Sequence, residues 1–199
     1  MPFCIVQLAN HDGRQQTGFP RPVVYPTEPA NSGWAQLREA QRTAAKADAY
    51  AELAVINDLG ETVDIHPLRK KEVAERIGLC FDRLVFNDKK VSLAPEVISA
   101  MVQDDKVILT LDQPVQSGTP REFELAGADG KFHNAEATAD GNRITILSPL
   151  TIPEQSSPTR SLSHLSPLKL RYAWKDDPKA DVRSLTGLPM SSFELNINK

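Results

Sequence analysis

The chain has 199 residues, 40% of them hydrophobic and 25% charged, and its formal net charge is −3. This is the composition of an ordinary globular protein, with room for one large domain or two small ones. Because there is no basic run, neither nucleic acid nor a membrane surface is expected as a partner. No stretch approaches the roughly 20 apolar residues of a membrane span.

The start of the chain and the cysteines exclude two further features. The opening "MPFCIVQLANHDG" lacks the basic region and the apolar length of a signal peptide, and the compartment is left open. Cys4 and Cys80 lie in apolar runs, which predicts buried free thiols. No spacing resembles a zinc site, so we expect no metal and no cofactor.

Residues 1–88 are predicted to form part of an α/β domain. The apolar run 3–8 is typical of a strand buried on both faces of a parallel sheet. A long proline-rich loop follows, and Ser32 is then expected to cap a helix over 34–47. The apolar stripe of this helix comprises Leu37, Ala40, Ala44 and Ala47.

A second strand and a second helix complete this half. The stretch "AELAVIND" predicts a buried strand that ends at Asp58. The next helix is expected to open at Pro67, because the missing N–H of proline costs nothing at the first helical position. Its apolar face comprises Val73, Ile77, Cys80, Phe81 and Leu84.

Residues 89–199 are predicted to form an antiparallel β-sandwich. "VISAMVQDDKVILTL" alternates on both sides of a Gln-Asp-Asp-Lys turn, which indicates a hairpin. Turns at 129–130 and 140–142 repeat the pattern. After a Ser/Pro-rich connection over 151–167 come two more strands. The first is expected to place Leu168, Leu170, Tyr172 and Trp174 on one face, and the second to begin with Phe193, Leu195 and Ile197.

The predicted α/β half is incomplete as a fold. Two parallel strands and two helices cannot cover both faces of a parallel sheet, and such sheets are normally buried on both sides. Either a partner chain or further α/β structure before Met1 must therefore pair with the strand at 3–8. We expect the chain to be the carboxyl-terminal part of a larger α/β enzyme.

Polar residues follow both predicted strands at the carboxyl end, where open α/β sheets bind their ligands. His11 and Asp12 follow the first strand; Asp58, Asp64 and His66 follow the second. If the strands are neighbours, the two loops form one rim. On spacing alone, His66 is either a general base supported by carboxylates or part of a helix start with solvated acids. A metal site from His11, Asp58 and His66 is not demanded by the spacing.

Several segments carry a family resemblance. They are "VQLAN", "SGWAQLREAQ", "AVINDLGETVDIHPLRKKEVAERIGL", "GADGKFHNAEA", "LRYAWKDDPKADV" and "TGLPMSSF". In this order, over nearly the whole chain, they resemble the carboxyl-terminal half of the sialate O-acetylesterases, which belong to the SGNH (GDSL-like) hydrolases. The resemblance implies an esterase that removes acetyl groups from sugar hydroxyls, typically on sialic acid, by a Ser-His(-Asp) mechanism.

The resemblance also implies site residues. The catalytic histidine of the family lies in an "IHP" motif, which here is His66. Many SGNH enzymes place the orienting aspartate three residues earlier, where this chain has Val63; Asp64 is therefore favoured, with a backbone carbonyl or Asp58 as alternatives. The Gly-Gln-Ser-Asn type motif of the nucleophile is absent from this sequence. An amino-terminal α/β segment or a second chain would supply that serine.

Substrate contacts are expected from the first helix and the rim. In "WAQLREAQ", Arg38 and Gln41 share a helical face, and the family has an Arg and a Gln on this helix beside the site. Both are predicted to bind substrate or shape the site; the alternative is a solvated helix face anchored by a buried Trp34. His11 is expected to line the rim, although the polarity of a loop explains its presence equally well. The alternative is a catalytically inactive accessory protein that binds glycans or a partner through its sandwich.

Overall fold

The computed structural model describes residues 1–12, 28–149 and 168–197. The predicted connection over 151–167 and most of the predicted proline-rich loop lie outside these residues. Neither helix of the described part is long and apolar enough to cross a membrane. The elements are β1 (Phe3–Val6), α1 (Gly33–Ala47), β2 (Ala51–Ala54), α2 (Lys70–Leu84), β3 (Val97–Gln103), β4 (Lys106–Leu111), β5 (Phe123–Ala126), β6 (Phe132–Ala135), β7 (Ala137–Asp140), β8 (Arg143–Leu147), β9 (Leu168–Tyr172) and β10 (Phe193–Ile197).

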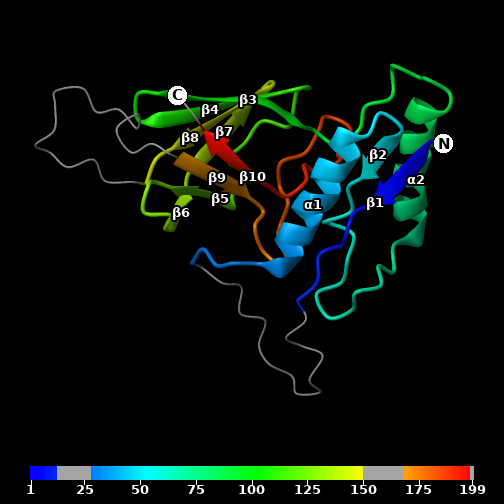
Figure 1. The fold of residues 1–199 in the computed structure, drawn as a ribbon, viewed down its shortest axis with the longest axis horizontal. Coiled ribbons are helices and arrows are strands. Elements are labelled where there is room, and N and C mark those ends of the chain that lie inside the picture. The colour runs from blue at the N-terminus through cyan, green and yellow to red at the C-terminus, as the bar shows by residue number, and fades with distance from the viewer. Residues whose placement is uncertain (13–27, 150–167, 198–199) are drawn as a thin grey trace, which may run out of the picture.

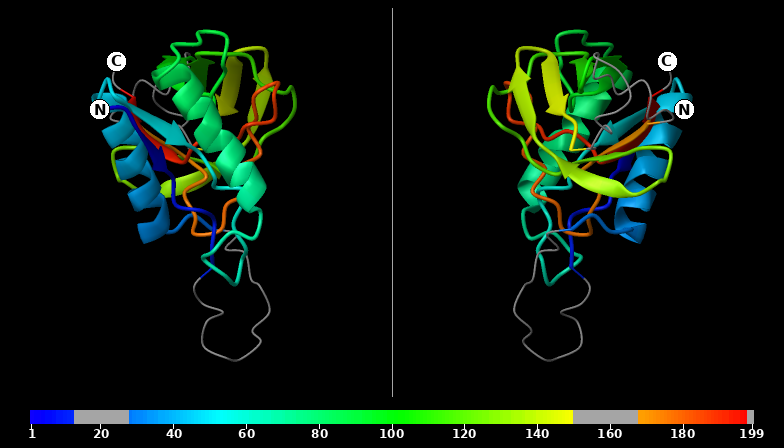
Figure 2. Two further views of the ribbon diagram at one scale, coloured as in Figure 1. Left: turned by 90° about the vertical axis from the view of Figure 1, so that its right-hand side faces the viewer. Right: turned by 90° about the vertical axis from the view of Figure 1, so that its left-hand side faces the viewer.

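The predicted fold class is confirmed: an α/β unit of two parallel strands and two helices is followed by antiparallel sheets. β1 pairs with β2 in parallel, from Phe3 opposite Ala51 to Val6 opposite Ala54. The helices lie on opposite faces of this pair (Figures 1 and 2). Side chains alternate between the two faces: Gln7, just after β1, bonds to α1, and the Cys4 thiol contacts that of Cys80 on α2.

The apolar stripe of α1 does not face the core. An apolar stripe ordinarily does, yet Leu37 is 49% exposed, and the three alanines that share its stripe are exposed as well. The buried face of α1 instead comprises Ala35, Arg38, Arg42 and Ala45. The predicted cap is present, because the Ser32 hydroxyl accepts a hydrogen bond from the Ala35 N–H at 2.9 Å.

The second helix begins later than predicted. α2 starts at Lys70, and Arg69 stands at its N-cap without a side-chain cap bond. Pro67 therefore lies in the preceding loop, and His66 lies four residues before the helix. The cysteine prediction is confirmed for Cys80, which is buried; Cys4 is half-buried, and both thiols are free.

The sandwich consists of two four-stranded sheets, ordered β10-β9-β5-β6 and β3-β4-β8-β7. The three predicted turns each close a hairpin and contain a residue at positive φ: Asp104 (54°), Gly130 (70°) and Gly141 (55°). Alternate residues of both sheets fill one apolar core. The largest fully buried apolar side chains in it include Phe123, Leu109, Leu125, Ile144, Ile146, Leu168, Leu170 and Tyr172.

The alternation along β9 predicts that Trp174 lies on the same face as Leu170 and Tyr172. In the structure it does not. Ala173 adopts φ of 50° and ends the extended pattern directly after β9. The Trp174 ring lies 4.7 Å from the guanidinium of Arg171, which also stacks 3.7 Å from the Phe132 ring. The tryptophan is buried on the side of the sheet that carries the charged residues.

Glu124 on β5 is a buried acid on this same side. It lies opposite Arg171 in the sheet, but that guanidinium bonds to Glu194 at 2.6 Å. In the described part of the chain, neither carboxyl oxygen of Glu124 has a hydrogen-bond partner. Burial raises the pKa of Glu124 to about 7, and the nearby Lys175 and Arg171 offset this only in part.

We expect Glu124→Gln to remove a pH dependence of stability. Because the folded pKa of Glu124 is raised, its stabilising contribution is complete below the ordinary Glu pKa and is lost as the pH rises through 7. At pH 8 the variant should exceed the wild type in free energy of unfolding by about 2 kcal/mol. Urea denaturation at pH 5 and pH 8 measures this. An equal difference between the proteins at both pH values would contradict it.

Candidate active site

The loops after β1 and β2 form one rim, as the sequence predicts for neighbouring parallel strands. The Gly60 N–H donates to the Asn10 side-chain oxygen at 2.7 Å, and the Asp12 N–H donates to the Thr62 carbonyl at 2.8 Å. The loops approach so closely at Gly60 that a Cβ there would lie 2.1 Å from the Asn10 carbonyl oxygen. Only glycine permits this contact.

A third segment, from the sandwich, holds the rim together. The Asp177 carboxylate accepts from the Asn10 amide at 2.7 Å and from the Thr62 hydroxyl at 2.8 Å. The neighbouring Asp176 accepts from the backbone N–H of His11 at 3.1 Å and from the Ser32 hydroxyl at 2.5 Å. The α/β unit and the sandwich are therefore joined at the rim itself.

Removing the Asp177 carboxylate should loosen the rim. Asp177→Ala leaves the Asn10 amide and the Thr62 hydroxyl without their acceptor. We expect a loss of about 2 kcal/mol in free energy of unfolding, because a charged acceptor of two hydrogen bonds disappears. Denaturant titration measures it. Asp129→Ala, in an exposed hairpin turn, is the matched control, and an equal loss in the two variants would contradict the assignment.

His66 and Asp64 form an exposed pair on the rim. The His66 Nδ1 lies 3.1 Å from Asp64 Oδ1, and the same oxygen accepts the His66 backbone N–H at 2.8 Å. These two hydrogen bonds lower the pKa of Asp64, the backbone bond being the larger cause. With a proton on Nδ1, Nε2 keeps its lone pair, and 81% of the His66 side chain is exposed.

The three residues that are predicted to bind substrate lie in three different environments. Arg38 is fully buried, and its guanidinium donates to the carbonyls of Lys175 (2.5 Å) and Asp176 (2.9 Å). Burial lowers the pKa of Arg38 to about 10. Gln41 is half-buried against β1, and His11 is 97% buried, with its ring 5.6 Å from that of Trp34. In this structure Arg38 and His11 support the rim from beneath, with no surface open to a sugar.

Asp58 does not orient His66. Its carboxylate is buried and binds the guanidinium of Arg76 at 2.5 and 3.0 Å and that of Arg183 at 2.7 Å. Although burial alone would raise the pKa of Asp58, these hydrogen bonds lower it. Within the described residues, no three His, Cys, Asp or Glu side chains are placed to hold a metal ion.

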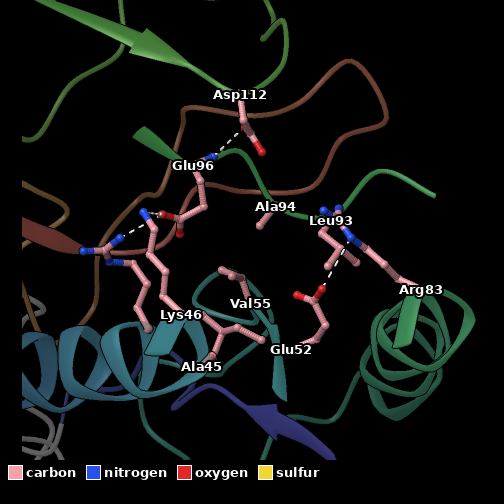
Figure 3. Close-up of a pocket in the computed structure, with 11 residues that line it drawn as sticks. Ala45, Lys46, Glu52, Val55, Arg83, Leu93, Ala94, Glu96 and Asp112 are labelled. Atoms are coloured by element: carbon pink, nitrogen blue, oxygen red, sulfur yellow. Dashed lines mark hydrogen bonds and ion pairs between the residues drawn. The ribbon is translucent and has the colours of Figure 1, made fainter. Parts of the chain in front are cut away.

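A cavity of about 120 Å³ lies elsewhere, where α1, β2 and α2 meet the segment that leads into β3 (Figure 3). Its charged side chains are paired with one another: Lys46 with Glu96 at 3.3 Å, and Arg83 with Glu52 at 3.4 Å. Arg83 lies near the end of α2, about 20 Å along the helix from its start. The cavity is therefore remote from His66, and it is not the candidate active site.

Asn10, Thr62 and Asp177 were missed by sequence reasoning. Each has an ordinary polar side chain in a loop, and Asp177 belongs to a segment more than 100 residues away along the chain. No local pattern links them. The one available signal is the "KDDP" stretch, in which a proline directly follows Asp177; it marks a polar loop but not its contacts.

The candidate site is therefore an exposed His66–Asp64 pair near the carboxyl ends of the two parallel strands, in an α/β unit that is joined to a β-sandwich. The chain is similar to the crystal structure of a carbohydrate acetylesterase from Xanthomonas citri, with 29% sequence identity and a TM-score of 0.74. The match covers 98% of this chain and 41% of that one, so the chain spans less than half of its relative. These figures indicate a relationship to the carbohydrate esterases. No family model and no curated protein matches the sequence.

Proposed function

We propose that this chain is the histidine-bearing part of a carbohydrate O-acetylesterase of the sialate O-acetylesterase type. The observation that carries the proposal is the exposed His66–Asp64 pair on a rim of parallel strands. The likeness to a carbohydrate acetylesterase supports the reaction class. The acetyl-bearing sugar is the substrate, and a serine from an α/β segment outside this sequence is the nucleophile.

In the proposed reaction His66 acts as general base and then as general acid. Its Nε2 takes the proton of the serine hydroxyl as the serine oxygen attacks the acetyl carbonyl carbon. Asp64 accepts the hydrogen bond from Nδ1 and stabilises the imidazolium. His66 then returns the proton to the sugar oxygen as the ester bond breaks. Water hydrolyses the acetyl-enzyme by the same route and releases acetate.

Asp64 is the proposed orienting residue among the three alternatives left by the sequence. Its carboxylate lies within hydrogen-bond distance of the ring, whereas the carboxylate of Asp58 is bound by two arginines. The double contact of Asp64 with the backbone and the ring of His66 fixes the direction in which the imidazole points. Asp64 lies two residues before His66, and the turn between them brings the carboxylate next to the imidazole.

The test is hydrolysis of an O-acetylated sialic acid and of an acetylated xylo-oligosaccharide. The 199-residue chain should show background activity alone. Mixed with the part of the Xanthomonas citri enzyme that has no counterpart here, it should release acetate, and its His66→Ala variant should not. If the chain alone turns over and His66→Ala does not, the nucleophile lies within these residues. Turnover that persists in His66→Ala would overturn the proposed role of His66.

A further inference from the structure

One edge of the β1–β2 pair is open. Among the described residues, β1 has a single neighbouring strand, β2. The odd-numbered residues of the β1 segment direct their backbone groups toward β2, because the N–H groups of Phe3 and Gln7 donate to the carbonyls of Tyr50 and Ala54. By alternation, the N–H and carbonyl of Cys4 and the N–H of Val6 point to the open side. Phe3 and Val6 are about 40% exposed there, on opposite faces of the pair.

The side chain of Gln41 closes one end of this edge. Its Oε1 accepts the Leu8 N–H at 2.8 Å, and its Nε2 lies 3.4 Å from the Val6 carbonyl. The amide thus takes the place that a neighbouring strand would occupy beyond Val6. Among the described residues, the open backbone groups argued for this edge are the N–H and carbonyl of Cys4 and the N–H of Val6.

The exposed stripe of α1 runs along the same edge. Gln41 reaches the open side of β1, and Leu37 and Ala44 lie four residues before and three residues after it, on the same helical face. Together with Ala40 and Ala47, these side chains form an exposed apolar strip without a charge. The small residues allow another element to approach the helix backbone closely.

α2 presents a matching surface on the other side of β1. Arg76 and Arg83 point from this helix toward Asp58 and Glu52, and Cys80 points to β1. The side of α2 that lies opposite the two arginines around the helix axis extends beyond β1, away from β2. It carries Phe81, Val85, Ala74 and Gly78, all exposed. Figure 2 shows β1 between the two helices.

We propose that this surface, made of the open edge of β1 and the flanking strips of α1 and α2, binds an α/β segment. A strand of that segment would add to β1 in parallel, and its helices would cover the two apolar strips. A parallel sheet is ordinarily covered on both faces and extended beyond two strands. More than half of the Xanthomonas citri relative has no counterpart here, which is ample chain for such a segment. The identity of the bound segment rests on the proposed function, whereas the assignment of the surface as a docking site does not.

Co-expression with the unmatched part of the Xanthomonas citri enzyme tests the proposal. The matching part of that enzyme, expressed separately, is the positive control. We expect a one-to-one complex by light scattering, and hydrogen exchange at the Cys4 and Val6 amides slowed at least tenfold. Leu37→Glu and Phe81→Glu should each weaken binding at least tenfold, whereas Leu185→Glu, at a more exposed site in the sandwich, should not. Unchanged thermal unfolding of each variant verifies its fold.

Two results would overturn the proposal. In the first, the positive control assembles and this chain does not. In the second, the chain forms a discrete homodimer that Leu37→Glu and Phe81→Glu both dissociate, which would make a second copy the occupant. A complex that forms as expected but releases no acetate leaves the docking surface intact and refutes the esterase proposal. The two proposals therefore fail separately.

Discussion

In the proposed complex with an α/β segment, His66→Ala is expected to lower kcat by about 10²–10⁴-fold, the usual contribution of a positioned general base. The imidazole is exposed on the rim, and Asp64 is its only hydrogen-bond partner in the described residues. Alanine removes the proton acceptor without disturbing packing, because the ring is not buried. KM should change little, since the loss falls on the step that activates the serine.

The matched control is His133→Ala, another exposed histidine, which lies in the sandwich. Its kcat should equal that of the wild type. Asp64→Asn should fall between the two, because the amide can still hold the ring but no longer balances the charge of the imidazolium. Rates of acetate release under saturating substrate measure all three variants. Equal loss in His66→Ala and His133→Ala would show that the histidine has no chemical role.

The sandwich could be predicted from the sequence because its signals are local. Alternating apolar residues mark each strand, and residues that adopt positive φ, such as Gly130 and Gly141, mark the turns between them. Where the alternation ends, the prediction also ends. Trp174 follows Ala173 at positive φ, and the tryptophan turns to the face that the pattern assigns to charged residues.

The α/β unit shows what a pattern of apolar residues cannot specify. Periodicity identified the strip that contains Leu37, but it gives no information about what covers that strip. The actual contact face of α1 centres on Arg38, whose guanidinium donates through one nitrogen to carbonyls of the distant segment 175–176. A buried arginine with partners more than 130 residues away leaves no local signal.

The candidate site was predictable in outline. Parallel strands bring their carboxyl ends together, and this alone predicted that the loops carrying His11 and His66 meet in one rim. The depth of each side chain was not predictable. His11 packs beneath the rim against Trp34, whereas the His66 side chain is 81% exposed, beside the Asp64 carboxylate that accepts its backbone N–H.

Asp58→Ala is expected to cost about 3–5 kcal/mol in free energy of unfolding, because it leaves two arginines without their buried counter-charge. The Asp58 side chain is 7% exposed and links Arg76 of α2 to Arg183 of the sandwich. The loop after β2, the second helix and the sandwich all depend on it. The rim that presents His66 should loosen together with the fold.

The pH dependence separates the charge of Asp58 from its packing. Its folded pKa is lowered, so its stabilising contribution is complete above the ordinary Asp pKa of about 4 and is lost as the pH falls through the lower folded value. The stability difference between wild type and Asp58→Asn should be full at pH 7 and shrink toward pH 3 in urea titrations. Glu75→Gln, in an exposed pair with Lys71, is the control and should match the wild type at both. A difference for Asp58→Asn that stays constant with pH would assign the effect to packing alone.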